Sequence, residues 1–327
     1  MNYIHPEAKL HPSVTVGHFS CIHEDVEIGE GTVIDNNVTI YSGTRIGKNC
    51  HIYSGAVIGG DPQDLKYKGE KTYAIIGDNT TIREFVTIHR GTASKGKTVV
   101  GNNCLIMAYC HVAHDCYLNN NIIMSNCTQL AGEVVVEDWA IIGGGSLVHQ
   151  FSHIGAHAMI QGGSKVNKDV PPYIIAAREP ISYCGINSVG LNRRAFTKEQ
   201  IDTIQQTYRL LYMSGLNVSQ AVEQIENTLP QTPERDFFVE GGAFVVKPVM
   251  RKGAPPHMYV TVPNGFFAKV HVQIPLVLDG RHRIAGALPY TGPAMDTDIA
   301  RVQNGVGLQF TVREDQSESY PRTELLG

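Results

Sequence analysis

Aliphatic side chains recur at every sixth position of this chain, in one phase from Ile4 to Val166. Steps of six give 28 positions in this range, and 25 of them hold an aliphatic residue or Met. The exceptions are Asp64, Glu70 and Ser94. They fall in residues 59–75 and 89–99, where the surrounding pattern is also lost. A repeat of constant short period indicates a stacked solenoid.

A period of six fits neither the helix period of 3.6 nor simple strand alternation. We interpret each hexad as one short strand and a corner, so that three hexads close a triangular turn. Inward aliphatic residues then stack turn upon turn and bury a continuous core, as in a parallel β-helix. The position after the aliphatic residue is often Gly or Asn, such as Gly17, Gly47 and Asn119. We expect these residues to take positive φ at tight corners.

The period changes after Val166, which predicts a second structural class. Residues 1–172 form the β-helix in this interpretation, and residues 173–192 read as a loop. Helical spacing then predicts helices over 197–213 and 218–229 and a short one near 234–239, the first begun by a capping box of Thr197 and Gln200. The predicted domains are 1–172, 173–240 and 241–327.

Residues 241–327 read as a further β-rich module of unknown role, and an appended module and a fusion both fit this pattern. Asn-Gly and Asp-Gly turn signals separate strand-like runs at 258–262, 266–278 and 307–312. The predicted fold is therefore mainly β, with a small α-helical domain between two β regions.

Composition narrows the classes of function. The chain has 327 residues and a net charge of −4, which argues against a nucleic-acid partner. It shows no apolar run of spanning length and no signal peptide, so we expect a cytoplasmic protein rather than an integral membrane protein. Cys104, Cys110 and Cys116 are six apart and fall on successive faces, which favours reduced thiols over disulfides.

The solenoid phase also brings candidate catalytic residues together. His114, Gly132 and Gln150 are spaced by one eighteen-residue turn, so they form a column on one edge. A histidine beside a bare backbone N–H suits general-base catalysis with an oxyanion donor. Asp115 follows the histidine and would orient its ring if the corner lets it reach Nδ1.

Structural interpretations compete with these roles. A histidine on an outward face is usually only solvated, and spacing alone gives His89 and His111 no role. On spacing alone, surface charge is the more common role for Lys66 and for the pair Arg193 and Arg194.

Several motifs resemble one enzyme family, the acyl-[acyl-carrier-protein]–UDP-N-acetylglucosamine O-acyltransferases of lipid A synthesis. The resemblance covers residues 1 to about 240. The motifs that carry it are PQDLKYKGE (62–70), IREFVTIHRGT (82–92), HVAHDC (111–116), IIGGGSLVHQF (141–151), DVPPY (169–173) and GINSVGLNRR (185–194). It implies a homotrimer of left-handed β-helices, with active sites between subunits and no cofactor. The acyl donor would be an acyl carrier protein with phosphopantetheine, and the acceptor UDP-N-acetylglucosamine.

The resemblance also implies roles for single residues. His114 would be the general base, Asp115 its support, and the N–H of Gly132 the oxyanion donor. Met159 and Gly162 would line the acyl-chain pocket. The substrate-binding residues would be Asp64, Lys66, His89, His111, His149, Gln150, Asn187, Arg193 and Arg194.

Three positions depart from the family pattern. Glu133 and Pro180 stand where many members have histidine, and Val189 where many have glutamate. These changes leave the base untouched and bear on contacts to the acyl chain and the nucleotide.

Two other functions fit parts of the pattern. His89, His111 and His114 could hold zinc, as in a carbonic-anhydrase-like β-helix. Alternatively, the trimer could be a scaffold that presents residues 241–327. The pathway's N-acyltransferase fits less well, because its members carry an N-terminal nucleotide-binding domain.

Overall fold

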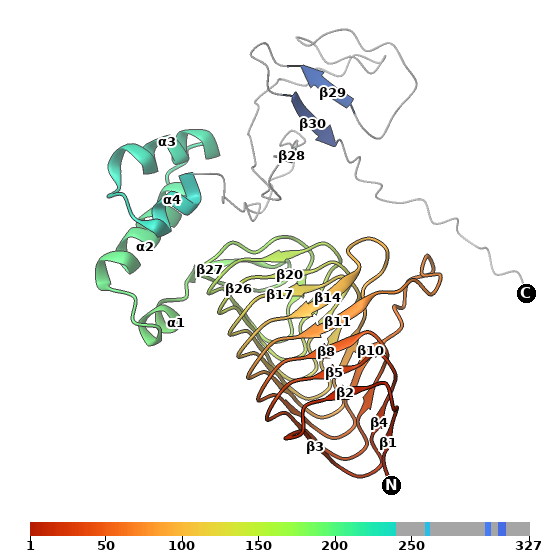
Figure 1. The fold of residues 1–327 in the computed structure, drawn as a ribbon. Coiled ribbons are helices and arrows are strands. Elements are labelled where there is room, and N and C mark those ends of the chain that lie inside the picture. Colours follow the sequence, from red (N-terminus) through yellow and green to blue (C-terminus); the bar gives the residue numbers. More distant parts are fainter. Residues whose placement is uncertain (240–258, 262–297, 302–306, 312–327) are drawn as a thin grey trace, which may run out of the picture. The chain divides into compact units, whose positions relative to one another are not determined.

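The computed structural model describes residues 1–239, 259–261, 298–301 and 307–311. The chain divides into two compact units. The described part of the first is Met1–Tyr208, and the second begins at Arg209. We describe each unit by itself (Figure 1).

The first unit is a triangular coil of three sheets whose strands are almost all parallel, with each turn adding one strand to each sheet. The nine-stranded sheet contains β1 (Tyr3–Ile4), β4 (Cys21–Ile22), β7 (Thr39–Ile40), β10 (Val57–Gly60), β13 (Thr87–His89), β16 (His111–Val112), β19 (Gln129–Leu130), β22 (Leu147–Val148) and β25 (Lys165–Val166). The eight-stranded sheet contains β2 (Lys9–Leu10), β5 (Glu27–Ile28), β8 (Thr44–Ile46), β11 (Tyr73–Ile76), β14 (Lys97–Val100), β17 (Tyr117–Leu118), β20 (Val135–Val136) and β23 (His153–Ile154). The ten-stranded sheet contains β3 (Thr15–Val16), β6 (Val33–Ile34), β9 (His51–Ile52), β12 (Thr81–Ile82), β15 (Leu105–Ile106), β18 (Ile123–Met124), β21 (Ile141–Ile142), β24 (Met159–Ile160), β26 (Ile174–Ala177) and β27 (Ser182–Ile186).

The hexad residues form the core of the coil, as the sequence predicts. Val112 of β16 pairs with Leu130 of β19, which pairs with Val148 of β22, so equivalent positions stack in register. These side chains are buried. Ile4 is 42% exposed, because the first turn has no turn beneath it. Burying each aliphatic side chain contributes about 2 kcal/mol, so the stacked hexad residues are the main source of the coil's stability.

The glycines that follow the hexad residues correct one prediction. Gly17, Gly47 and Gly77 do not have positive φ; the left-handed conformation falls two residues later, at Phe19, Asn49 and Asn79. A Cβ on any of these glycines would lie 2.9 Å or less from backbone of the next turn. Glycine is favoured there by close approach between turns, not by corner conformation.

The segment predicted as a loop after residue 172 instead extends the ten-stranded sheet. β26 pairs in parallel with β24, and β27 returns antiparallel to β26. The period of six is lost here because the strands lengthen to four and five residues. Helix α1 (Ser188–Arg193) follows. Tyr208 of α2 (Lys198–Met213) is buried and donates a hydrogen bond to the carbonyl of Pro172 at 2.6 Å.

The predicted helices are confirmed, with small differences in their ends. At the start of α2, Thr197 and Gln200 form the reciprocal hydrogen bonds of a capping box. In the second unit, the end of α2 is followed by α3 (Val218–Thr228) and α4 (Pro233–Val239). Asn217 is the N-cap of α3 and forms a second capping box with Gln220.

Three further strands are described near the C-terminus. β30 (Gly307–Thr311) pairs antiparallel with both β28 (Tyr259–Thr261) and β29 (Asp298–Arg301). The strand predicted at 266–278 and the three turn signals lie outside the described residues. None of the helices described here combines the length and the hydropathy that crossing a bilayer would need.

Candidate active site at one corner of the coil

One corner of the coil, between the nine-stranded and the eight-stranded sheets, carries the predicted catalytic column. The chain turns this corner between β16 and β17 at His114, between β19 and β20 at Gly132, and after β22 at Gln150. Glu133 N–H donates to the carbonyl of His114 at 3.0 Å, and Phe151 N–H to that of Gly132 at 3.2 Å. Successive turns are therefore joined at this corner.

Both interruptions of the repeat emerge at the same corner. The longer one leaves β10 and returns at β11, and the shorter one leaves β13 and returns at β14. The hexad phase alone does not predict which corner carries these loops. The order of strands in the sheets places them in the two turns that precede the turn with His114.

His114 and Asp115 form a hydrogen-bonded pair. The distance from Nδ1 of the ring to Oδ2 of the carboxylate is 2.9 Å. Asp115 has a φ of 60°. Because of this left-handed corner conformation, its side chain can reach the ring of the preceding residue, which regular strand geometry would not allow. The side chain of His114 is 10% exposed and that of Asp115 is 0% exposed.

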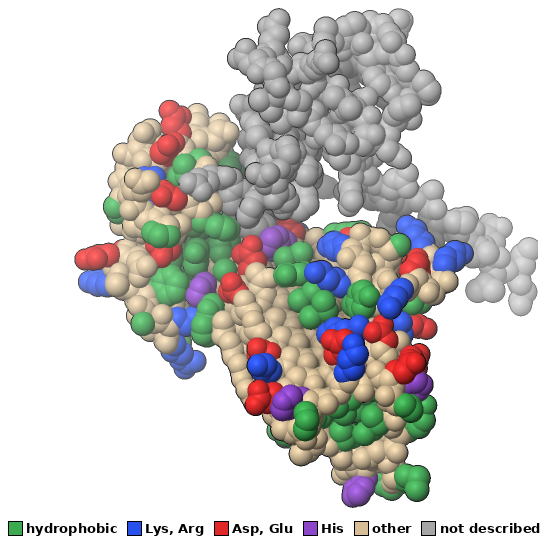
Figure 2. Space-filling model, viewed as in Figure 1, with side chains coloured by type: hydrophobic (Ala, Val, Ile, Leu, Met, Phe, Trp, Pro, Cys, Tyr) green, Lys and Arg blue, Asp and Glu red, His purple; other side chains and the backbone are tan. Residues whose placement is uncertain are grey.

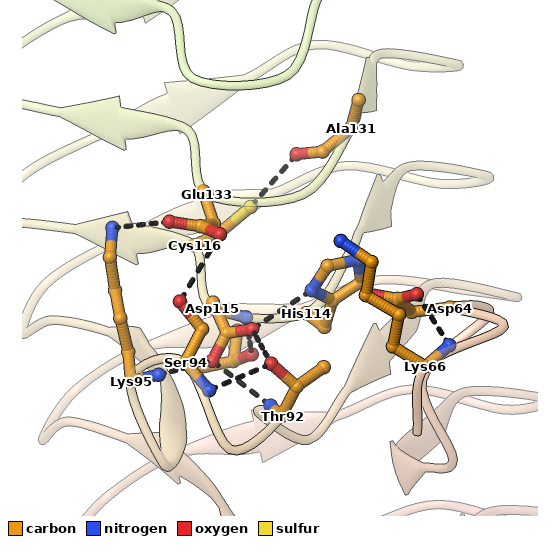
Figure 3. A network of polar contacts seen from close by, with 11 residues as sticks. Asp64, Lys66, Thr92, Ser94, Lys95, His114, Asp115, Cys116, Ala131 and Glu133 are labelled. Atoms are coloured by element: carbon orange, nitrogen blue, oxygen red, sulfur yellow. Dashed lines mark hydrogen bonds and ion pairs between the residues drawn. The ribbon is translucent and has the colours of Figure 1, made fainter. Parts of the chain in front are cut away.

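Three further donors reach the buried Asp115 carboxylate from the loop between β13 and β14 (Figure 3). Thr92 donates through its backbone N–H at 3.0 Å and its hydroxyl at 2.6 Å, and Lys95 donates through its backbone N–H at 3.3 Å. A buried carboxylate that accepts several hydrogen bonds is stabilised in its ionised form. An ionised Asp115 places the proton of neutral His114 on Nδ1 and leaves Nε2 as the basic nitrogen.

Gly132 lies against the imidazole ring of His114. A Cβ at this position would be 2.6 Å from Cε1 and 2.7 Å from Nε2. Only glycine therefore allows the next turn to approach the basic nitrogen this closely.

His89 and His111 line the nine-stranded face beside the pair. Their ring centroids are 4.7 Å apart, and His111 Nδ1 lies 2.7 Å from the hydroxyl of Thr87. Burial, followed by the neighbouring His111 and His114, lowers the pKa of His89 to about 4. Burial and His114 also lower the pKa of His111. Nδ1 of His89 is buried and has no hydrogen-bond partner among the described residues.

The longer loop carries Asp64 and Lys66. Oδ1 of Asp64 accepts a hydrogen bond from the backbone N–H of Lys66 at 2.8 Å, which fixes a tight turn. In Figure 3 the two residues lie on the side of the His114 ring away from Asp115. The Lys66 side chain is exposed, so its ammonium group is available to a ligand.

Glu133, one of the departures from the family pattern, is tied to the shorter loop. Its carboxylate lies 3.6 Å from Nζ of Lys95 and accepts a hydrogen bond from the hydroxyl of Ser94 at 3.2 Å. The other departures, Pro180 and Val189, are exposed.

The remaining predicted residues lie elsewhere on the first unit. His149 and Gln150 follow β22 at the catalytic corner, where His149 is exposed. Met159 is in β24 of the ten-stranded sheet, and Gly162 is exposed at the corner after it. This corner, between the ten-stranded and nine-stranded sheets, is not that of His114.

Asn187 and Arg194 make contacts at the third corner. Asn187 caps α1 by accepting from Gly190 N–H, and its amide donates to the carbonyl of His157 at 2.9 Å. Arg194 lies over the ring of Trp139, 5.2 Å from its centroid, and donates to the Trp139 carbonyl at 2.9 Å. Asn187 is thus engaged within its own chain. Arg193 is exposed in the last turn of α1.

Sequence reasoning missed Thr92, Ser94 and Lys95. The signal was present, because Thr92 ends the motif IHRGT and the loop interrupts the repeat at this point. Its link to Asp115 depends on the folded path of the loop.

Outside the catalytic corner, ion pairs gather on the outer face over β5, β8 and β11 (Figure 2). Arg45 lies 2.5 Å from Asp25 and 3.7 Å from Glu27, and Lys71 lies 3.3 Å from Asp25. The thiols of Cys104, Cys110 and Cys116 are free and buried. They lie at successive corners of the coil rather than on the successive faces that the spacing predicts. Burial raises the pKa of Cys116 to about 12, which disfavours the thiolate form that a nucleophile would need.

Across the described residues, no three His, Cys, Asp or Glu side chains are grouped so as to hold a metal ion. The zinc hypothesis for His89, His111 and His114 therefore has no ligand set in the part of the chain that the structure describes.

Comparison with known proteins identifies the family. The family described as UDP-N-acetylglucosamine O-acyltransferase, domain 2, matches residues 169–243, and that described as bacterial transferase hexapeptide matches residues 25–60 and 97–132. An acyl-[acyl-carrier-protein]–UDP-N-acetylglucosamine O-acyltransferase of Pseudomonas putida is 48% identical over 72% of this chain and 92% of its own length. The chain belongs to this O-acyltransferase family.

Solved structures agree with this assignment. A UDP-N-acetylglucosamine acyltransferase from Bacteroides fragilis is 51% identical, with a TM-score of 0.72 over 73% of this chain and 94% of its own. The enzyme from Francisella novicida is 42% identical, with a TM-score of 0.71 over 73% of this chain and 88% of its own. The family's fold thus accounts for the coil and the helices that follow it.

Proposed function

We propose that this protein transfers an (R)-3-hydroxyacyl chain from acyl carrier protein to the 3-hydroxyl of UDP-N-acetylglucosamine, the first step of lipid A synthesis. The relatives that carry this name support the substrates. The observation that carries the chemistry is the buried His114–Asp115 pair, with Gly132 against the ring.

In the proposed reaction, Nε2 of His114 removes the proton from the sugar 3-hydroxyl as its oxygen attacks the thioester carbonyl. The tetrahedral intermediate places negative charge on the former carbonyl oxygen, and the N–H of Gly132 stabilises it. Collapse breaks the carbon–sulfur bond, and His114 returns the proton to the leaving phosphopantetheine thiolate. Asp115 holds the ring and stabilises the imidazolium between these steps.

The two histidines beside His114 favour its role as a base because they are not positively charged. Burial lowers the pKa of His89 to about 4 and also lowers the pKa of His111, which favours the neutral form of both rings. Protonation of His114 during turnover then meets no like charge on the adjacent rings. With no metal in this scheme, the chemistry needs only the side chains present and no cofactor.

We infer that the complete site forms between copies of the chain in a left-handed, homotrimeric assembly. Within one chain, His114, Arg194 and Gly162 lie at three different corners of the coil. A second copy could bring its own corners to His114. The roles proposed for the nucleotide-binding and acyl-chain residues then follow: Asp64, Lys66, His149, Gln150 and Arg193 contact substrate, and Met159 and Gly162 line the acyl chain.

We also infer a cytoplasmic location. All seven cysteines are free, and reduced thiols are the rule in that compartment.

The test is a transfer assay with purified protein, (R)-3-hydroxyacyl carrier proteins of several chain lengths, and UDP-N-acetylglucosamine. Mass spectrometry should detect the O-acylated sugar nucleotide with at least one chain length, and none with a 3-deoxy acceptor. Activity should persist after treatment with a chelator. Absence of transfer with every donor, or equal transfer to the 3-deoxy acceptor, would refute the proposal; a loss reversed by zinc would support the metal-dependent alternative.

A further inference from the structure

The loop between β13 and β14 connects to both halves of the proposed catalytic apparatus. Thr92 and Lys95 donate three hydrogen bonds to the Asp115 carboxylate. Ser94 and Lys95 contact the carboxylate of Glu133, the residue that follows Gly132. The loop therefore contacts Asp115, which supports the general base, and Glu133, which directly follows the proposed oxyanion donor Gly132.

The hydroxyl of Thr92 is held in one orientation. It lies 2.6 Å from Oδ2 of Asp115, the same oxygen that faces Nδ1 of His114. Its own oxygen accepts a hydrogen bond from the backbone N–H of Ser94 at 3.1 Å. Because this interaction occupies an acceptor position, the hydroxyl proton is directed to Asp115. Thr92 is 7% exposed, so water does not readily replace it.

The backbone around Thr92 is also fixed. Gly96 N–H donates to the carbonyl of Thr92 at 2.7 Å, and Gly91 N–H to that of Tyr73 at 3.1 Å. Before them, Arg90 donates through its backbone N–H to Gly60 at 3.0 Å and pairs with Asp61 at 3.1 Å. The loop is thus a closed, hydrogen-bonded unit whose conformation sets the hydroxyl position.

We propose that Thr92 is a positioning residue for the His114–Asp115 pair, acting through its hydroxyl on Oδ2 of Asp115. This inference rests on the proposed function of His114 as general base. The hydroxyl fixes the rotamer of the carboxylate and therefore the orientation of the imidazole. It also takes part of the negative charge of Oδ2, the oxygen that faces Nδ1 of His114.

Other charged or titratable groups surround the pair and must be unchanged in the test. His89 and His111 face it from β13 and β16, and Lys95 and Glu133 lie at the outer side of the loop. Asp64 and Lys66 approach from the longer loop (Figure 3).

The experiment compares the full-length Thr92→Val and Thr92→Ser variants with the wild type by the pH dependence of kcat/KM. Valine keeps the branched shape and replaces the hydroxyl by a methyl group. We expect Thr92→Val to lower kcat about 10-fold with KM little changed, since a hydrogen bond to a charged group is lost. Without this donor Oδ2 presents more negative charge to the ring of His114, so the acidic limb of the profile should shift to higher pH. Thr92→Ser should restore both the wild-type kcat and the wild-type position of the acidic limb.

Thr80→Val is the matched control. Thr80 is a buried threonine like Thr92, and its hydroxyl donates to the carbonyl of Gly101 at 2.7 Å, in a part of the coil without predicted site residues. This variant should lose stability and keep the wild-type pH profile. A Thr92→Val enzyme with an unshifted limb and near-normal kcat overturns the positioning role, as does an unshifted limb with reduced kcat that serine does not restore.

His114→Ala separates this proposal from the one it rests on. If His114→Ala retains full transfer, the general-base assignment fails, and the role of Thr92 fails with it. If His114→Ala is inactive while Thr92→Val behaves as wild type, only the role of Thr92 is wrong.

Discussion

At the scale of single residues, proximity to the ring of His114 decides what each position tolerates. Asp115 reaches Nδ1 at 2.9 Å only because its corner has a φ of 60°. Gly132 leaves no room for a Cβ beside Nε2. Two elementary constraints, a left-handed corner and an absent side chain, therefore fix both sides of the imidazole.

The Gly132→Ala substitution tests this steric argument. Because the new methyl group would lie 2.6 Å from Cε1 of His114, the ring must move, and kcat/KM should fall about 100-fold or more. Steady-state kinetics and the melting temperature should be measured together. Gly215→Ala is the control. Gly215 has a positive φ, which Gly132 does not, and a Cβ at Gly215 would meet no atom within 4 Å, so this substitution should lower stability modestly and leave kinetics unchanged. Wild-type kinetics in Gly132→Ala would contradict the account.

The sequence predicts some contacts of the candidate site and not others. Spacing alone predicted the column of His114, Gly132 and Gln150, because a constant period determines which residues stack. It could not predict the bonds from Thr92 to Asp115, since these depend on the path of a loop that leaves the period. The reason given for glycine after each hexad residue was wrong, because close contact between turns is invisible in a linear sequence.

At the scale of elements, the coil is stabilised by stacking between neighbouring strands. Each strand of two residues is too short to be stable by itself and depends on turns on both sides. The repeat does not predict the two strands that follow residue 172, because they do not share its period. β26 and β27 are longer strands outside the repeat, and the antiparallel return of β27 has no hexad signature. The helices were found because their capping residues and spacing are local.

The position of a hexad residue along the coil should determine how much the free energy of unfolding falls when its side chain is removed. Ile106→Ala, at a fully buried site in mid-coil, should cost about 2–5 kcal/mol and lower the melting temperature by roughly 5–15 °C. Ile4→Ala makes the same chemical change at the exposed end of the coil and should cost less than about 1 kcal/mol. Thermal unfolding of both variants at one protein concentration provides the comparison. Equal losses would show that stacking does not dominate stability.

At the scale of the whole molecule, the family resemblance is confined to the coil and the helices. The matching family regions end at residue 243, and the relatives and structures compared above cover 72–73% of the chain. Those relatives are themselves covered over 88–94% of their length. The residues needed for transfer should therefore lie before residue 241, and the predicted β-rich module at 241–327 should not be needed for chemistry.

Removal of residues 241–327 tests this division. The shortened chain should keep kcat/KM within about threefold of the full chain, because no predicted site residue is lost. Transfer rates and the oligomeric state by light scattering should be measured side by side for the two forms. A shortened protein that keeps its assembly but loses transfer would assign the last 87 residues a catalytic role.

The most direct test of the central claim is the kcat/KM of His114→Ala for transfer to UDP-N-acetylglucosamine. A size and circular-dichroism comparison with the wild type establishes that the fold is kept. If His114 is the general base, the loss should be about 100-fold to 10,000-fold across the pH range. A variant that folds normally and transfers acyl chains within a few-fold of the wild-type rate would contradict the mechanism proposed for this corner of the coil.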